Sequence, residues 1–97
     1  MYARVARWEG SDAEAMRATA ERIKSQAGSG PPEGVPAKAF KLLIDPESGR
    51  SLSITFFESE EDLNTGDETL SAMNPPTDEM GQRVSVERYE VAVEVSA

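Results

Sequence analysis

Hydrophobic and polar residues alternate most regularly between Leu52 and Phe56. Ser53 and Thr55 separate Leu52, Ile54 and Phe56, and this period of two predicts a β-strand with one buried face. A slip of one residue in the pairing of such a strand would exchange its apolar face for its polar one. The pattern therefore favours a single register for this strand.

A second alternating run, Phe40–Ile44, precedes this strand, and the turn sequence Asp45–Arg50 joins the two runs. We predict a β-hairpin with the three-residue loop Glu47–Gly49, in which Gly49 takes the left-handed bulge position. The expected pairs are then Ile44 with Leu52, Leu42 with Ile54, and Phe40 with Phe56. If these six side chains pack under the helices, the opposite face is half polar and carries Ala39, Lys41, Leu43, Ser53, Thr55 and Phe57.

A helix is predicted to begin near Ser11, where the chain changes to a period close to 3.6. The sequence Ser11–Glu14 matches a capping box, in which Ser11 accepts a hydrogen bond from the Glu14 amide while the Glu14 side chain reaches back. Gly28 is a natural end point, and Gly28–Pro36 has the composition of a loop. The expected sheet-facing stripe consists of Ala13, Met16, Ala20, Ile23 and Ala27.

A second helix is predicted after Ser59, which can cap the amide groups that follow it. The acids of Glu60–Asp62 suit the positive amino end of a helix, and Asn74–Pro76 stops the helix. Gly66 weakens it by about 1 kcal/mol relative to alanine. The apolar residues at helical spacing are Leu63, Leu70 and Met73.

Two further segments are predicted strands, at the two ends of the chain. Tyr2–Glu9 is short, carries aromatic and β-branched residues, and has no clearly apolar face. Arg83–Val95 is longer, and its apolar side changes near Glu87–Arg88, which predicts either a β-bulge there or different partners for the two halves.

The order strand, helix, strand, strand, helix, strand matches the ferredoxin-like split βαβ arrangement. We therefore expect residues 1–97 to form a single α+β domain, with two helices on one face of a four-stranded antiparallel sheet. The other face is either solvated in a monomer or packed on the same face of a second copy. In the second case Val91, Val93 or Val95 is expected to contact the second chain.

Composition narrows the function classes. The chain has 97 residues and a net charge of −8, and its 10 basic residues are scattered among 18 acidic ones, so a nucleic-acid partner is not expected. It contains no cysteine and no histidine, which removes thiolate chemistry, the usual zinc ligands and the commonest acid–base side chain. The acidic run near Glu60 lacks the spacing of a calcium loop, and no metal is expected. No signal core or membrane span is apparent, so we expect a soluble cytoplasmic protein.

The segment Gly49–Leu63 resembles the third strand and the following helix start of the dimeric α+β-barrel superfamily, in its antibiotic-biosynthesis-monooxygenase-like branch. The element order extends this resemblance over nearly the whole chain. The resemblance implies a homodimer packed sheet to sheet, with a cleft between sheet and helices in each protomer. Some members oxidise polycyclic phenols with oxygen and no cofactor, and others degrade haem through a histidine ligand. This chain has no histidine, so no cofactor is expected.

Three classes of function remain open. The first is a homodimeric, cofactor-independent, monooxygenase-like protein that oxidises or binds a small apolar or aromatic compound. The second is a non-catalytic dimeric module that binds a ligand or a protein, and the third is a stable fold with a purely structural or regulatory role. An aromatic side chain could stack on a flat substrate beside an arginine, or could be only a core or interface anchor. No catalytic residue is assigned. The candidate pocket residues are Arg4, Trp8, Met16, Phe56, Met73 and Tyr89.

Overall fold

The structure is a computed structural model that describes residues 1–25, 34–72 and 81–96. The described residues confirm the predicted alternation of strands and helices and the ferredoxin-like α+β fold. Neither of the two described helices is long and apolar enough to cross a membrane. The elements are β1 (Tyr2–Glu9), α1 (Ala13–Ser25), β2 (Ala39–Asp45), β3 (Arg50–Phe57), α2 (Glu60–Ala72) and β4 (Gln82–Glu90).

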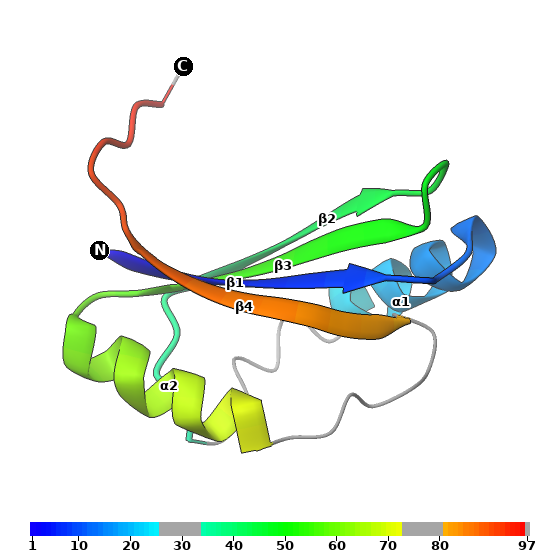
Figure 1. Ribbon diagram of the computed structural model, residues 1–97. Coiled ribbons are helices and arrows are strands. Elements are labelled where there is room, and N and C mark those ends of the chain that lie inside the picture. Colours follow the sequence, from blue (N-terminus) through cyan, green and yellow to red (C-terminus); the bar gives the residue numbers. More distant parts are fainter. Residues whose placement is uncertain (26–33, 73–80, 97) are drawn as a thin grey trace.

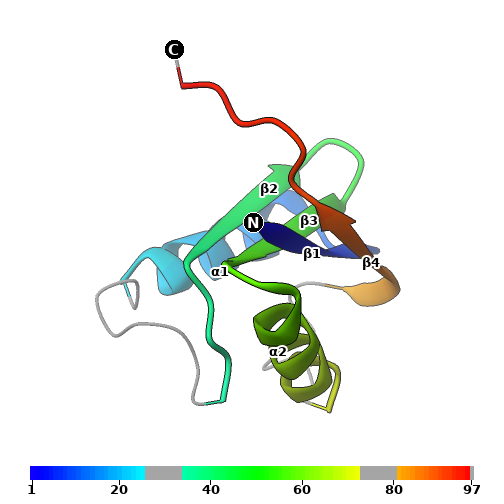
Figure 2. The same cartoon turned by 90° about the vertical axis from the view of Figure 1, so that its left-hand side faces the viewer.

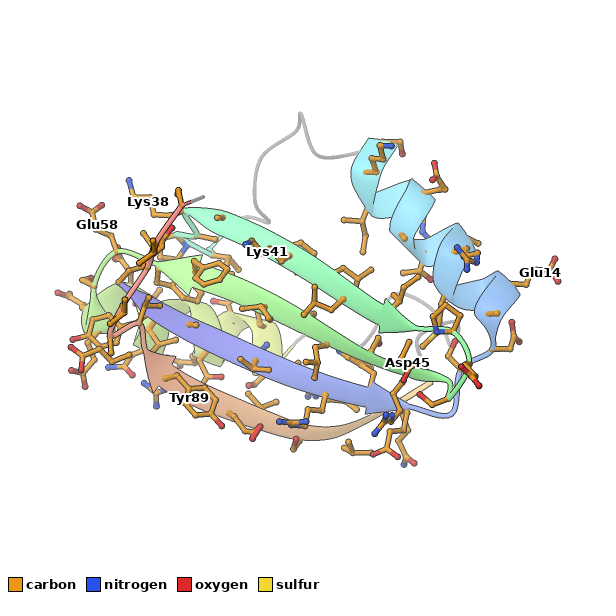
Figure 3. The ribbon with its side chains drawn as sticks, turned by 90° about the horizontal axis from the view of Figure 1, so that it is seen from above. Glu14, Lys38, Lys41, Asp45, Glu58 and Tyr89 are labelled. Carbon is orange, nitrogen blue, oxygen red and sulfur yellow. The ribbon has the colours of Figure 1, made fainter. Side chains whose placement is uncertain are left out.

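The four strands form one antiparallel sheet in the order β2-β3-β1-β4. Helix α2 packs against β1 and β3, and α1 packs against β2. Both helices lie on the same side of the sheet, which we call the helix side (Figures 1 and 2). The opposite side, which we call the open face, carries no helix among the described elements (Figure 3).

The hairpin between β2 and β3 differs from the predicted one by one residue. Its turn contains the four residues Pro46–Gly49, and the observed pairs are Asp45 with Arg50 and Leu43 with Leu52. Asp45 explains the longer turn, because its carbonyl oxygen accepts from the Gly49 amide at 3.0 Å and its Oδ1 accepts from the Ser48 amide at 3.4 Å. The prediction that Gly49 is left-handed is confirmed by its φ of 74°.

The face of β3 that meets the helices is the less apolar one. Phe57 points to the helix side and is fully buried, and Thr55 on the same side is also buried. Leu52, Ile54 and Phe56 consequently lie on the open face, which is the opposite of the arrangement considered above. Successive side chains of a strand point to opposite faces of the sheet. Because Phe57 is buried under the helices, Leu52, Ile54 and Phe56 must all lie on the other face.

Two separate clusters form the core beneath the sheet. One contains Ala6 and Trp8, against which Leu42 and Val86 pack. The other contains Val35, Phe57 and Leu63, together with the partly buried Tyr2, Ala37 and Leu70. The second cluster is the one that α2 covers, since Leu63 belongs to that helix.

The helix starts are set by short side chains. Asp12, and not the predicted Ser11, caps α1, because its Oδ1 accepts from the Ala15 amide at 2.8 Å. Ser59 caps α2 as predicted, since its Oγ accepts from the Asp62 amide at 3.1 Å. Within α1, Met16 is buried as expected, and the buried residue one turn later is Thr19. The predicted ends of both helices and most of the loops that follow them lie outside the described residues. Residues 34–36 of the first loop are described, and Val35 among them is buried in the second core cluster.

Strand β4 ends at Glu90, before the predicted limit of Val95. The irregularity in its pairing lies opposite Arg7 and Trp8, and no bulge occurs near Glu87–Arg88. Beyond Glu90 the chain leaves the sheet, and the side chains of Val93 and Val95 are 78% and 84% exposed.

Gly66 provides a first test of the packing. A Cβ atom at this position would overlap the ring of Phe57, which is fully buried and cannot move into solvent. We expect Gly66→Ala to lower the free energy of unfolding by about 1 kcal/mol in urea titrations, although alanine favours helix by a similar amount, because overpacking costs about 1–3 kcal/mol. In a Phe57→Leu background the same change should be stabilising. A stabilising effect of Gly66→Ala alone would contradict the contact.

Candidate functional site

The structure divides the predicted pocket residues between the two sides of the sheet. Arg4 and Trp8 lie on the helix side of β1, and Met16 of α1 is fully buried beside the sheet. Phe56 and Tyr89 lie on the open face, so these two do not share a site with the first three. Met73 lies outside the described residues.

Trp8 is packed and hydrogen-bonded on the helix side. The residue is 9% exposed, and its Nε1–H donates to Ser53 Oγ at 3.2 Å. The guanidinium carbon of Arg83 lies 5.9 Å from the ring centroid, within the range of a cation–π contact. Both polar contacts fix the orientation of the indole, which is therefore presented in one defined position.

An apolar band crosses the helix side of the sheet through Trp8. Leu42 of β2 and Val86 of β4 pack against Ala6 and Trp8 of β1, while the Ser53 hydroxyl lies between them on β3. Phe40 is on the same side of β2 and is 46% exposed. We call these residues the transverse band: Phe40, Leu42, Ser53, Ala6, Trp8 and Val86. Their mixture of aliphatic, aromatic and hydroxyl groups is typical of a small-molecule contact surface.

The Arg4 side chain connects β1 to α2. Its Nε donates to Asp67 Oδ1 at 2.8 Å and its NH2 donates to Ser71 Oγ at 3.3 Å. The Arg4 side chain is 5% exposed and that of Asp67 is 25% exposed. Arg88 of β4 also donates to Asn64 Oδ1 on α2. Because an isolated buried charge is costly, the pairing with Asp67 makes Arg4 a structural anchor in this conformation.

The open face carries an apolar centre. Val5 pairs with Ile54, and Leu43 pairs with Leu52, so these side chains share one surface with Phe56. The ammonium group of Lys41 lies 5.9 Å above the Phe56 ring (Figure 3). Leu43 is 49% exposed. The protein therefore presents apolar side chains on the face opposite its helices.

A hydrogen-bonded group of three side chains borders this apolar centre. Arg7 Nε donates to Glu87 Oε2 at 2.7 Å, and the Tyr89 hydroxyl donates to Glu87 Oε1 at 3.1 Å. These two hydrogen bonds, the one from Arg7 first, lower the pKa of Glu87, while the bond to Glu87 raises the pKa of Tyr89. Tyr89 is therefore a neutral donor at neutral pH, and it is not a phenolate base.

A shallow hollow of about 320 Å³ lies at the hairpin end of the sheet. The predicted pocket residue Trp8 contributes to its lining, together with Leu43 and Leu52 of the open face and the charged Arg7, Asp45 and Arg50. Arg50 NH2 lies 3.3 Å from Asp45 Oδ2, so these charges are already paired. The volume is at the lower end for ligand pockets, and a second molecule packed on the open face would cover this hollow.

Two residues that interact with the candidate residues on the helix side were not predicted from the sequence. Arg83 contacts Trp8 across neighbouring strands, and Asp67 contacts Arg4 over 63 positions of sequence. Neither residue carries a local signal, since an arginine in a polar strand and an aspartate in a helix are ordinary surface residues. Only the strand order could have brought these pairs together.

Comparison with known proteins gives structural relatives only. No protein-family model matches the sequence, and no curated protein matches it. Among solved structures, the haem degrader MhuD from Mycobacterium tuberculosis, with two haems bound in its active site, has a TM-score of 0.66 at 18% identity. That comparison covers 99% of this chain and 100% of MhuD.

Two further structures match over nearly the full length. A point mutant of MhuD with two manganese protoporphyrin IX molecules per active site has a TM-score of 0.62 at 22% identity, covering 100% of both chains. A proposed antibiotic biosynthesis monooxygenase from Deinococcus radiodurans has a TM-score of 0.57 at 10% identity, covering 100% of this chain and 98% of the other. The chain shares their ferredoxin-like fold. The resemblance to the antibiotic-biosynthesis-monooxygenase-like branch is thus confirmed at the level of the fold.

The residues of this ferredoxin-like chain do not fit an iron-ligated haem. The sequence has neither histidine nor cysteine, so it offers no imidazole or thiolate to the metal. Of the other side chains that ligate haem iron, the Tyr89 hydroxyl donates to Glu87 on the open face and Met16 is fully buried. Among residues 1–25, 34–72 and 81–96, no three Asp or Glu side chains are grouped so that they could hold a metal ion. Any flat ligand would therefore be held by packing and hydrogen bonds.

Proposed function

We propose that the protein is a homodimer that binds a small, flat, apolar or aromatic compound on the transverse band. The observation that carries this proposal is the band itself. Trp8 is fixed by Ser53 and Arg83, and Leu42 and Val86, which pack against the cluster of Ala6 and Trp8, are only partly buried. Phe40, two residues before Leu42 on the same side of β2, is 46% exposed. A flat compound could cover the partly exposed Phe40, Leu42 and Val86 beside the buried Trp8, and gain the favourable transfer of apolar surface from water.

The open face supports the homodimer in this proposal. It presents Val5, Ile54, Leu52 and Phe56 as one apolar surface, and a sheet with helices on one side can bury its other side only against another layer. The same face of a second copy supplies a matching apolar surface and satisfies two-fold symmetry. The cytoplasm remains the expected compartment within this proposal.

Catalysis is the second candidate, in the form of cofactor-independent oxygenation of a phenol. The shared fold with a proposed monooxygenase supports it. Arg83, beside Trp8, could stabilise the phenolate form of a bound substrate, and molecular oxygen would supply both the inserted oxygen atom and the water released. Against it, the carboxylate of Asp67 is engaged by Arg4, so the described helix side provides no assigned general base. For this reason, binding of the compound without chemical turnover is the first proposal and catalysis the second.

Trp8 makes the binding proposal directly measurable, because it is the only tryptophan in the chain. We expect dihydroxyanthrone, a tricyclic phenol, to quench Trp8 emission saturably and to release heat in calorimetry. Metal-free protoporphyrin IX and haemin should bind with similar affinity, since no imidazole or thiolate is available to the iron. Absence of saturable binding by all three probes would refute the proposal.

Neighbouring residues of β2 provide a matched pair of variants. Leu42 lies on the transverse band and Leu43 lies on the open face. Leu42→Gln should weaken ligand binding by about tenfold, since it removes roughly 1.4 kcal/mol or more of apolar contact, whereas Leu43→Gln should leave binding unchanged. Equal effects of both substitutions would place the ligand elsewhere. Oxygen uptake with any compound that binds separates catalysis from binding alone.

A further inference from the structure

Two arginines lie directly opposite each other on the helix side of the sheet, Arg4 on β1 and Arg88 on β4. Arg4 donates to Asp67 and Ser71 of α2. Arg88 donates to Asn64 of the same helix, so both side chains extend in one direction. Like charges at opposite positions of neighbouring strands repel each other, because their Cα atoms are only about 5 Å apart. We call Arg4 and Arg88 the arginine pair.

The arginine pair has one carboxylate partner for its two charges. Asp67 forms an ion pair with Arg4, whereas Asn64, the partner of Arg88, is neutral. Glu90 is the next residue on this side of β4, but the ion pairs within residues 1–25, 34–72 and 81–96 do not include Arg88. Arg88 is exposed, and in a chain with 18 acidic and 10 basic residues it is a cation that an external anion can reach.

Part of the Arg4 guanidinium also lacks a partner. Its Nε and one terminal nitrogen hold α2, while the other terminal nitrogen donates to no described residue. The Arg4 side chain is only 5% exposed, and a buried charged donor is costly unless it is hydrogen-bonded. In the described part of the chain, only the Ser51 and Ser85 hydroxyls are fully enclosed without a partner. The free nitrogen of Arg4 therefore retains an opening to solvent, through which an acceptor oxygen can approach it.

The arginine pair adjoins the transverse band. Ala6 and Val86 of the band lie opposite each other, two residues further along the same strands. Two residues of a strand span about 7 Å, which is close to the size of one aromatic ring with a small substituent. A flat compound that covers Ala6 and Val86 therefore places a substituent on its edge at the arginine pair.

We propose that the arginine pair binds the carboxylate of an aromatic acid whose rings lie on the transverse band. This inference rests on the proposed function and specifies its ligand class as aromatic carboxylates. The two oxygen atoms of a carboxylate accept from Arg4 and Arg88 at once, and such charge-assisted hydrogen bonds are roughly twice as strong as neutral ones. The bound anion also lies between two positive charges and thereby removes their repulsion.

Two probes of the same shape test the ligand class. Anthraquinone carboxylate and the uncharged anthraquinone carboxamide, substituted at the same ring position, differ in the charge of one group. We expect the protein to bind the carboxylate at least about tenfold more tightly than the carboxamide, in Trp8 quenching and in calorimetry. Equal affinities for the two probes would overturn the anion site.

Substitutions at exposed positions of the site test which residues cause the preference. Arg88→Met removes one guanidinium and should weaken carboxylate binding by about tenfold, while binding of the carboxamide stays unchanged. Asn64→Asp should have the same selective effect, because it places a competing carboxylate against Arg88 without changing the size of the side chain. Arg17→Met on the exposed surface of α1 is the control: it removes the same charge and should leave both affinities unchanged.

The outcomes separate this inference from the proposed function. If dihydroxyanthrone and both anthraquinone probes fail to bind, the proposed function and the anion site are overturned together. If dihydroxyanthrone or the carboxamide binds and the carboxylate has no advantage, the anion site alone is overturned. The anion site is also overturned if Arg17→Met reduces the preference for the carboxylate as much as Arg88→Met does.

Discussion

Ile54→Asp is expected to convert the proposed dimer into a monomer. Ile54 lies at the centre of the open face, between Val5 on β1 and Lys41 on β2. An unpaired carboxylate at the centre of an apolar interface is strongly unfavourable, so the dimer dissociation constant should rise by about 100-fold or more. Light scattering over a concentration series measures this change.

The matched control is Ala18→Asp on the exposed side of α1, which adds the same charge and should leave the dimer intact. Circular dichroism should show that both variants keep their secondary structure, because Ile54 is not part of the two core clusters under the helices. A folded Ile54→Asp protein that remained dimeric at the wild-type affinity would remove the open face from the interface.

Gly49→Ala is expected to cost about 3 kcal/mol of folding free energy, measured by urea denaturation. Gly49 has a φ of 74°, a conformation that costs a non-glycine residue roughly 1–2 kcal/mol. A Cβ atom there would also overlap the carbonyl oxygen of Ser11, and Ser11 donates its amide to the Gly49 carbonyl at 3.2 Å. The obstacle is backbone, so no side-chain rotation relieves it, and overpacking adds about 1–3 kcal/mol.

Gly10→Ala separates these two costs. Gly10 has a φ of 86°, but a Cβ atom there would have no atom within 4 Å. It should therefore lose only the conformational term of roughly 1–2 kcal/mol. Equal losses for the two variants would mean that the contact between the hairpin and the start of α1 does not constrain Gly49.

The sequence was sufficient for the kinds of elements and their order, because each depends on local signals. The Ser59 cap and the left-handed Gly49 are such signals. The orientation of β3 was not predictable in this way. Phe56 and Phe57 are adjacent aromatic residues whose side chains point to opposite faces of the sheet, so either face could be the one packed against the helices. The buried position of Phe57 on β3 depends on the space that Gly66 of α2 leaves for its ring. This is a contact between two elements, and no local sequence signal reports it.

For the candidate site, residue type proposed the residues but not their surroundings. Trp8, Arg4 and Met16 were identified by residue type, and the structure brings all three to the helix side. The partners that define their environment were missed, because Asp67 and Arg83 acquire meaning only through the strand order β2-β3-β1-β4. For Arg4, this partner changes the interpretation from an available cation to an anchor of α2.

The four-residue turn Pro46–Gly49 has an evolutionary consequence. The length of the turn sets which side chains of β2 lie on the open face. These are at present Ala39, Lys41 and Leu43. Loss of a single codon in the turn would shift β2 by one residue and bring Phe40, Leu42 and Ile44 to the outside instead. One deletion would thus exchange a partly charged contact surface for a fully apolar one, so a new assembly could arise without any change of side chain.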